Sequence, residues 1–179
     1  METDNGSGSG FVISKSGYLF TCYHVVKDAN EIFVRLVLRS GKREVYKAEI
    51  IITNEDEDYA ILKVLDCTGL CFYEIEEDYS QIKTGDDVAV WGYPYGADLN
   101  EKVMELEPSL TKGYISSKNK IHGKDCFYLD IHSSPGNSGG PVFSLSTNKV
   151  IGYLCGSYGS DRSNLIYIKT MEHFLSTLK

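Results

Sequence analysis

The sequence predicts an all-β protein, and three observations support this prediction. Short apolar runs rich in Val, Ile, Tyr and Phe recur along its 179 residues. Gly, Asn, Asp and Ser separate these runs, as in a β-sandwich or β-barrel. The periodicity of an amphipathic helix is nearly absent. The runs are numerous enough to build two small barrels.

The predicted strands each combine β-branched or aromatic residues with a flanking turn signal. One helix is expected near the end of the chain, over residues 171–178, because Phe174 and Leu178 are four residues apart and share a face. In chain order the predicted strands cover residues 10–14, 18–22, 32–38, 45–53, 59–64, 87–92, 110–116, 126–131, 142–145, 150–154 and 165–169.

We expect a single domain over residues 1–179 that consists of two barrels. The segment 74–84 is acidic, poor in apolar residues and ends in turn residues, so it is the expected linker. The N-terminal barrel then covers about residues 6–73 and the C-terminal barrel about residues 85–170. The terminal helix follows over about residues 171–178.

The chain is acidic, with 18 Lys and Arg against 25 Asp and Glu and a net charge of −7. Binding to nucleic acid or to an anionic membrane needs a surplus of cations that displaces counterions. We therefore expect neither partner. The longest apolar runs are strand-sized and interrupted by charge, so no transmembrane segment is expected.

The first residues are acidic and polar, without the basic and apolar stretches of a secretory signal. Five cysteines form an odd, widely spaced set, which favours reduced thiols over a disulfide framework. Both observations predict a cytoplasmic protein. Cys67 and Cys71 lack neighbouring ligands, so no zinc site is expected there, and nothing else in the sequence predicts a metal or a cofactor.

The strongest chemical signal is a serine enclosed by glycines, in Gly136-Asn137-Ser138-Gly139-Gly140. A nucleophilic serine needs a tight turn that exposes its hydroxyl, with backbone N–H groups where negative charge develops during acyl transfer. Glycine supplies the backbone torsions and leaves room for a substrate. Ser138 is therefore the candidate nucleophile, and a purely structural β-turn is the alternative interpretation.

A nucleophilic serine also needs a base. His24 lies directly after the apolar strand that ends at Cys22, where a short helical turn is expected. A strand-end histidine without a catalytic task is the alternative interpretation, but the serine motif favours the catalytic one.

The third member of such a site is a carboxylate that orients the imidazole. The acidic run 55–58 offers four candidates. Asp58 is preferred because it is the last of them and begins an apolar strand, so that its side chain can point inward. Asp56 is the second choice.

The chain order His, Asp, Ser and the local sequences resemble the chymotrypsin-like serine proteases, and the HtrA (Deg) branch is the most similar. The similar segments are Gly6 to Ile13, Thr21 to Val25, Asp58 to Leu62, Gly85 to Gly96 and Leu110 to Ser116. The resemblance covers nearly the whole chain. It implies a chymotrypsin-like fold of two six-stranded β-barrels with the triad at their interface. The PDZ module that typically follows the protease domain in HtrA proteins is not part of the 179 residues.

The resemblance implies that His24 is the general base, Asp58 the orienting acid and Ser138 the nucleophile. It implies an oxyanion hole at the turn of Gly136, Asn137 and Ser138, with the N–H groups of Gly136 and Ser138 as donors. In digestive relatives, an Asp at the position of Asn137 pairs with a newly cut N-terminus. We therefore expect activity that does not depend on N-terminal cleavage.

By position, the substrate pocket is expected to be lined by His132, Cys155, Gly156, Ser157 and Leu165. No carboxylate occupies the expected floor of the pocket. Because a buried cation needs an anionic partner, we expect a small or medium apolar P1 residue unless Asp130 or Asp161 folds inward. Recognition of an acidic P1 residue by protonated His132 is the alternative.

Taken together, these observations predict a serine endopeptidase that acts on protein or peptide substrates. We expect an intracellular, regulated protease of stress or defence, with an activating partner or a larger polypeptide context as a further element. Two alternatives stay open, a catalytically latent binding module with the protease fold and a viral polyprotein-processing protease.

Overall fold

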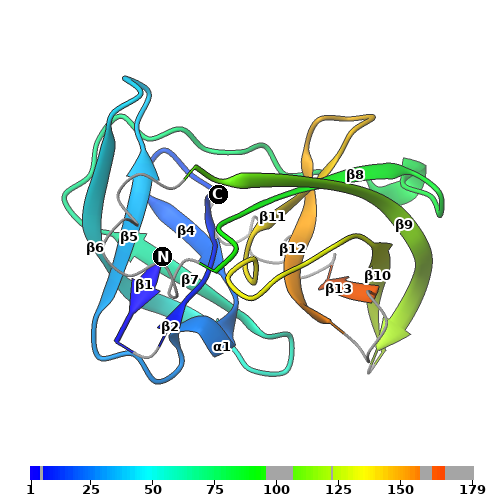
Figure 1. Ribbon diagram of the computed structural model, residues 1–179, viewed down its shortest axis with the longest axis horizontal. Coiled ribbons are helices and arrows are strands. Elements are labelled where there is room, and N and C mark those ends of the chain that lie inside the picture. The colour runs from blue at the N-terminus through cyan, green and yellow to red at the C-terminus, as the bar shows by residue number, and fades with distance from the viewer. Residues whose placement is uncertain (5, 96–106, 122, 158–162, 168–179) are drawn as a thin grey trace.

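The computed structural model describes residues 1–4, 6–95, 107–121, 123–157 and 163–167. Almost all regular structure in these residues is β (Figure 1). The helix predicted over 171–178 lies outside the described residues. Within them, no helix combines the length and the apolar character needed to cross a bilayer.

The N-terminal half forms one antiparallel sheet with the strand order β2-β1-β5-β6-β7-β4-β3. A four-residue helix, α1 (Tyr23–Val26), directly follows β4. The strands are β1 (Glu2–Thr3), β2 (Gly6–Ser7), β3 (Phe11–Val12), β4 (Tyr18–Thr21), β5 (Ile32–Val37), β6 (Arg43–Asn54) and β7 (Tyr59–Val64).

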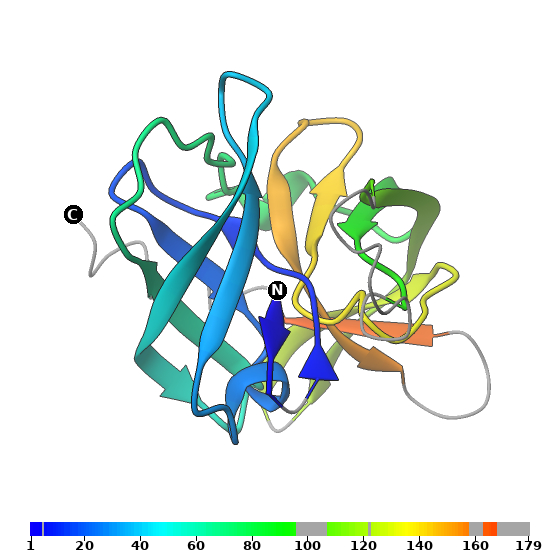
Figure 2. The same ribbon diagram turned by 60° about the vertical axis from the view of Figure 1, so that its left-hand side comes forward.

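The C-terminal half is a closed barrel with the order β10-β13-β12-β11-β8-β9. Figure 2 shows this barrel beside the curled N-terminal sheet. Its strands are β8 (Asp87–Gly92), β9 (Ser109–Ile121), β10 (Lys124–Asp130), β11 (Pro141–Ser144), β12 (Val150–Ser157) and β13 (Ser163–Tyr167). The architecture confirms the predicted all-β, chymotrypsin-like double β-barrel.

The N-terminal sheet differs from the six-stranded barrel that the resemblance implied. It is an open sheet of seven strands, of which five are β3 to β7 and two form the hairpin of β1 and β2 at one edge, with Thr3 paired to Ile32 of β5. These strands are two residues long and composed of polar residues and glycine. They carry no apolar alternation, so the sequence did not predict them.

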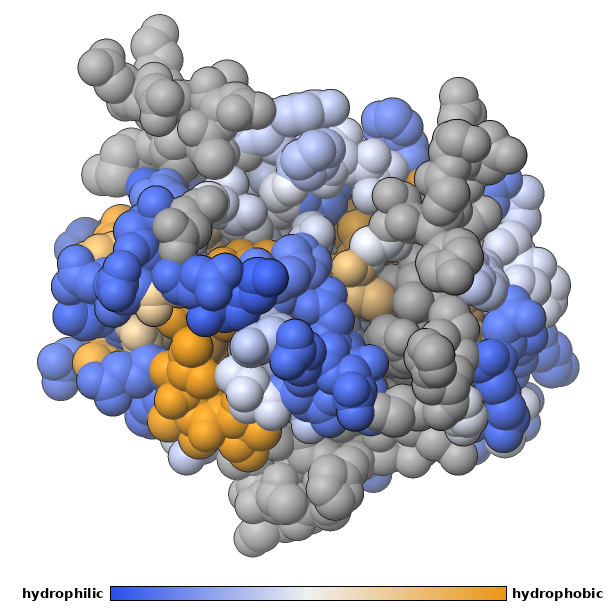
Figure 3. Space-filling model, turned by 90° about the horizontal axis from the view of Figure 1, so that it is seen from below, coloured by the Kyte–Doolittle hydropathy of each residue, from blue (hydrophilic) through white to orange (hydrophobic). Residues whose placement is uncertain are grey.

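Strand β6 exposes apolar side chains to solvent. Its pairing with β7 shifts register between Ile50 and Ile52, which is the signature of a β-bulge. Ile50, Ile51 and Ile52 are all exposed, and Figure 3 shows an apolar area on the side of the molecule that carries the N-terminal sheet.

A third core cluster joins the two halves, in addition to one core inside each sheet. Phe20 from β4 lies at its centre, with ring centroids 4.7 Å from Tyr153 of β12 and 5.5 Å from Tyr59 of β7. Offset aromatic contacts of this kind add to the burial of apolar area. This shared core fixes β4 and β7, whose ends carry His24 and Asp58, against the barrel that carries Ser138.

The segment predicted as a linker is attached to the C-terminal barrel. Ile75 forms a parallel bridge with Val150, and the N–H of Glu76 donates to the Val150 carbonyl at 2.8 Å. The Glu76 side chain is buried, and its Oε1 accepts the N–H of Asp78 at 3.2 Å. The Lys149 ammonium lies 3.6 Å from the same oxygen.

Candidate active site

A histidine and a carboxylate meet at the junction of the two halves. The Nδ1 atom of His24 lies 2.6 Å from Oδ2 of Asp58. The second oxygen, Oδ1, accepts the backbone N–H of His24 at 2.9 Å. Two hydrogen bonds to the same residue fix both the ring orientation and the carboxylate plane. The side chain of His24 is 44% exposed and that of Asp58 is 26% exposed, so the ring remains accessible from solvent.

A tight turn before β7 directs Asp58 toward the histidine. Asp58 adopts a left-handed backbone with φ of 51°, which Asp tolerates better than most residues. The side chain of Asn54 accepts the Glu57 N–H at 3.0 Å and closes the turn. The hydroxyl of Tyr153, from the other half, donates to the Glu57 carbonyl. The contact with His24 is thus made by Asp58, and Asp56 is exposed.

Glycines at positive φ shape the turn that carries Ser138. Gly136 has φ of 95° and Gly139 has φ of 83°, conformations that an L side chain rarely adopts. There is also no room for a side chain at these glycines, because a Cβ at Gly136 would lie 2.3 Å from the Tyr93 carbonyl oxygen. A Cβ at Gly139 would lie 2.3 Å from the Ser9 carbonyl oxygen. The Gly-rich motif is therefore required by torsion and by packing.

The serine turn packs against the segment that carries the histidine. A Cβ at Gly139 would lie 2.9 Å from the backbone nitrogen of Cys22, two residues before His24. A Cβ at Gly8 would lie 2.6 Å from Val25, the residue after His24, and 3.3 Å from the Ser138 carbonyl oxygen. The structure thereby packs the turn of Ser138 against the segment that carries His24, which itself contacts Asp58.

Ser9 links the N-terminal sheet to the serine turn through both its backbone and its side chain. Its N–H donates to the Ser138 carbonyl at 2.8 Å, and its hydroxyl donates to the Gly136 carbonyl at 2.7 Å. The same hydroxyl accepts the Tyr93 N–H at 2.9 Å, and the Ser9 carbonyl accepts the Thr21 hydroxyl at 2.8 Å. The sequence reasoning missed this role, although Ser9 lies in the Gly-Ser-Gly run of the first similar segment.

Two N–H groups of the serine turn are available to a ligand. Within the described part of the chain, the N–H groups of Gly136 and Ser138 have no hydrogen-bond acceptor. The N–H of Asn137 between them donates to the Ser134 carbonyl at 3.1 Å. Of the three predicted oxyanion-hole residues, Gly136 and Ser138 therefore have N–H groups that can donate to an oxyanion.

The Asn137 side chain is buried below this turn. It is 5% exposed, and its Oδ1 has no hydrogen-bond partner among the described residues. A Cβ at Gly92 would lie 2.4 Å from that oxygen, so the amide is tightly enclosed. A neutral amide suits this position because none of the described residues donates to its oxygen, and a buried carboxylate would need a cationic partner.

The predicted substrate-pocket residues are only partly described. His132 is exposed, and Cys155 is buried in the core cluster between the two halves. Gly156 pairs with Leu165 across β12 and β13, and a Cβ at Gly156 would meet open space. The side chains of Ser157 and Leu165 lie outside the described part. Gly156 and Leu165 therefore lie side by side in the C-terminal barrel, but the described residues form no pocket at these positions.

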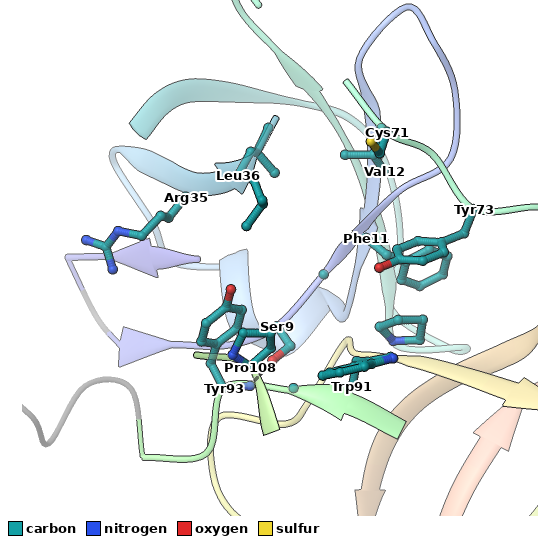
Figure 4. A pocket seen from close by; sticks show the side chains of 14 residues that line it. Ser9, Phe11, Val12, Arg35, Leu36, Cys71, Tyr73, Trp91, Tyr93 and Pro108 are labelled. Carbon is teal, nitrogen blue, oxygen red and sulfur yellow. Dashed lines mark hydrogen bonds between the residues drawn. The ribbon is translucent and has the colours of Figure 1, made fainter. Parts of the chain in front are cut away.

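A cavity of about 160 Å³ is lined in part by Ser9 (Figure 4). Four aromatic residues contribute to its walls, which are Phe11, Tyr73, Trp91 and Tyr93. Of the predicted substrate-pocket residues whose side chains are described, which are His132, Cys155 and Gly156, none lines it. It is therefore a feature separate from the expected P1 site.

Cys22 contributes a thiol to the edge of the site, which the sequence reasoning also missed. It is fully buried and donates to the Leu154 carbonyl at 3.2 Å. Burial raises the pKa of this thiol well above its ordinary value, and the nearby Asp58 carboxylate raises it further. The thiol is therefore protonated at neutral pH, and none of the five cysteines forms a disulfide.

Comparison with known proteins agrees with this geometry. A family model described as a trypsin-like peptidase domain matches residues 8–152. A protein of Pseudomonas putida strain W619, named a probable periplasmic serine endoprotease DegP-like, is 37% identical over 149 residues. A protein of Halomonas elongata with the same name is 39% identical over 155 residues. These alignments cover 81% and 84% of this chain but 28% and 29% of the relatives.

The expectation of a cytoplasmic protein is contradicted by these relatives, which are named periplasmic. That expectation depended on the first residues of the sequence and on the cysteine count. Neither identifies a compartment for a chain that spans less than a third of the length of these relatives.

Solved structures share the architecture. The HtrA-type protease AlgW with a decapeptide superimposes with a TM-score of 0.77 at 24% identity, over 96% of this chain and 51% of AlgW. Deg5 superimposes with a TM-score of 0.76 at 26% identity, over 93% of this chain and 80% of Deg5. With the matched family domain and the named relatives, these findings show that the chain belongs to the trypsin-like peptidase family and is HtrA-like.

Proposed function

We propose that this chain is a serine endopeptidase that cleaves peptide bonds through Ser138, His24 and Asp58. The observation that carries the proposal is the 2.6 Å contact between His24 Nδ1 and Asp58 Oδ2 beside a serine turn fixed by Ser9. The curated relatives support it, since they are named serine endoproteases.

In the proposed acylation step, the Ser138 hydroxyl attacks the carbonyl carbon of the scissile bond. His24 Nε2 accepts the hydroxyl proton while its Nδ1–H donates to Asp58, which stabilises the imidazolium. The tetrahedral oxyanion accepts the two available N–H groups of Gly136 and Ser138. His24 then returns the proton to the departing amine, which leaves an acyl ester on Ser138.

In the proposed deacylation step, His24 removes a proton from water, and the resulting hydroxide attacks the ester carbonyl. The ester bond breaks, Ser138 recovers its proton from His24, and the new carboxylic acid leaves and loses its own proton to solvent. The protein contributes side chains and backbone N–H groups to these steps, and water is the second nucleophile.

Intact-mass analysis after treatment with a fluorophosphonate probe tests this function without a known substrate. We expect one probe adduct on the wild-type chain and none on Ser138→Ala. Ser133→Ala removes a hydroxyl from the same segment and should still be labelled. Absence of an adduct on the wild type would overturn the proposal and favour a latent binding module with the protease fold.

For specificity, we propose cleavage after small or medium apolar P1 residues. Asp130 is exposed and accepts the Tyr114 hydroxyl at 2.6 Å. This contact supports the expectation that Asp130 does not supply a carboxylate to the floor of the P1 pocket. A peptide library that varies only P1 should be cut fastest with an apolar residue. Fastest cleavage after Arg or Lys would contradict this specificity while leaving the endopeptidase proposal intact.

We also propose a regulated role in stress or defence, with protein substrates and an activating partner or larger polypeptide context. The names of the DegP-like relatives support protein substrates. The chain should cut an unfolded model protein faster than the same protein folded. Equal labelling by the probe with and without extract of the source cells would argue against an activating partner.

A further inference from the structure

A thiol, an imidazole and a carboxylate converge at the candidate active site. One ligand atom each from Cys22, His24 and Asp58 lies within 4.8 Å of the other two. Among the described residues, no other three His, Cys, Asp or Glu side chains come this close. The peptidase chemistry uses two of these groups and leaves the thiol without a task.

The donor set has the chemistry of a zinc site. Thiolate, imidazole and carboxylate are the three usual protein ligands of Zn²⁺, at about 2.0 to 2.3 Å in a tetrahedron. The sulfur and nitrogen donors disfavour Mg²⁺ and Ca²⁺, which prefer oxygen alone. A hydrogen bond of 2.6 Å joins His24 Nδ1 and Asp58 Oδ2 in the metal-free chain, and a bound ion would take the place of the shared proton.

We propose that Zn²⁺ binds between Cys22 Sγ, His24 Nδ1 and Asp58 and thereby switches the peptidase off. This inference depends on the proposed function for its consequence but not for the binding itself. The Cys22 thiol releases its proton to solvent as it coordinates the ion, and the His24 proton moves from Nδ1 to Nε2 through solvent, so the ring stays neutral. The thiolate and the carboxylate then balance its two positive charges.

The surroundings tolerate the change in Cys22. Its thiol now donates to the Leu154 carbonyl, which also accepts the Gly139 N–H at 2.7 Å. That carbonyl therefore keeps a partner when the thiol proton is lost, so no acceptor is left unsatisfied. The side chains of His24 and Asp58 are 44% and 26% exposed, so the proposed fourth ligand is a water molecule from solvent.

Binding removes the general base. With its Nδ1 electron pair on the ion, the His24 ring no longer donates to Asp58, so an imidazolium can no longer be stabilised. The proton now on Nε2 also leaves no electron pair there to accept the proton of Ser138. Inhibition is thus expected to be complete when the site is full.

Cobalt absorption tests the binding directly, because thiolate-bound Co²⁺ has a charge-transfer band in the near ultraviolet. The metal-free chain is titrated with Co²⁺, alongside Cys22→Ala and the matched control Cys71→Ala, which removes an exposed thiol. We expect the band in the wild type and in the control, its loss in Cys22→Ala, and its displacement by Zn²⁺. His24→Ala, at an exposed position, should also lose tight binding.

Absence of the band from the wild type would overturn the site. Its survival in Cys22→Ala with loss in Cys71→Ala would overturn it too, because the surface thiol would then be the ligand. Circular dichroism shows whether each variant is folded. If Cys22→Ala is unfolded, the His24→Ala result tests the site instead.

Probe labelling gives the inhibition, with each protein compared with its own metal-free rate. Zn²⁺ should abolish labelling of the wild type and of Cys71→Ala, and a chelator should restore it. Unchanged labelling at Zn²⁺ concentrations that displace cobalt would overturn the switch. If the metal-free wild type is never labelled, the proposed function fails, and the cobalt band still decides the metal site.

Discussion

The hydroxyl of Ser9 donates to the carbonyl of Gly136 at 2.7 Å, although the two residues are 127 positions apart. Ser9 belongs to the N-terminal sheet side of the molecule, and Gly136 begins the turn that presents Ser138. The bond therefore fixes the oxyanion donors of one half relative to the histidine of the other. Ser9 is 1% exposed, so water does not compete for this bond.

Ser9→Ala should lower the kcat of the peptidase while the chain stays folded. The variant leaves the Gly136 carbonyl and the Tyr93 N–H without their partner, at a cost of about 1–3 kcal/mol in the free energy of unfolding. The turn then samples conformations in which the oxyanion donors diverge. We expect kcat to fall with KM nearly unchanged, measured on a peptide substrate.

The exposed hydroxyl of Ser16 provides the control, because Ser16→Ala removes only a surface contact to Ser14. A Ser9→Ala enzyme with a wild-type kcat would show that the bond has no positioning role.

Gly139→Ala should prevent the serine turn from forming. Its φ of 83° is strained for alanine by about 1–3 kcal/mol, and its Cβ would also meet the Ser9 carbonyl oxygen at 2.3 Å. Gly85→Ala is the matched control, since its φ is 92° but no atom lies within 4 Å of the new Cβ. Thermal denaturation should show a much larger loss for Gly139→Ala. Equal losses would mean that torsion alone explains this glycine.

Asp58→Asn should inactivate the chain while leaving it folded. The amide retains the size of the carboxylate but favours the wrong His24 tautomer, so kcat should fall by about 10⁴. Asp56→Asn changes the other candidate of the acidic run, which is exposed, and should leave kcat unchanged. Steady-state kinetics on one peptide substrate distinguish the two. A large fall for Asp56→Asn would reverse the roles given to these carboxylates.

Asn137→Asp should destabilise the fold. The position is 5% exposed, and no described group donates to its Oδ1. A charge placed there without a partner costs several kcal/mol, or the acid stays protonated. The expected result is a lower midpoint of chemical denaturation, with the loss growing as pH rises and the acid ionises. An unchanged midpoint at neutral pH would reveal a cation that reaches this site.

The sequence was informative where apolar residues repeat and where a motif constrains the backbone. The strands on each side of the shared core have strong alternation or apolar runs, and β7 and β8 have the predicted bounds. The two-residue strands β1 and β2 lack any pattern, and β9 extends to Ile121 through polar residues that no propensity marks. Pairing with a neighbouring strand, rather than local preference, decides these segments.

The site was predictable for residues defined by a motif and not for those defined by distance. Ser138 and His24 lie in recognisable local patterns, and the position of Asp58 at the start of a strand separated it from Asp56. The roles of Ser9 and Cys22 depend on contacts across 127 and 132 positions, to Gly136 and Leu154. No local pattern contains such a contact, so only the folded chain reveals it.

Glu76 should make the fold sensitive to acid. Burial acts to raise the pKa of its carboxyl, but this is outweighed by the Asp78 N–H, the Thr147 side chain and the Lys149 ammonium, so the pKa lies below the ordinary value of 4.5. A carboxyl with a lowered pKa in the folded state stabilises the fold above pH 4.5, and this contribution disappears as pH falls through the folded pKa. Glu76→Gln should therefore be less stable than the wild type at neutral pH, and the difference in the free energy of unfolding should shrink below pH 4.5. Glu74→Gln, at an exposed position two residues away, should match the wild type at every pH. A difference that persisted unchanged into acid would mean that the shape of the buried side chain, and not its charge, stabilises this segment.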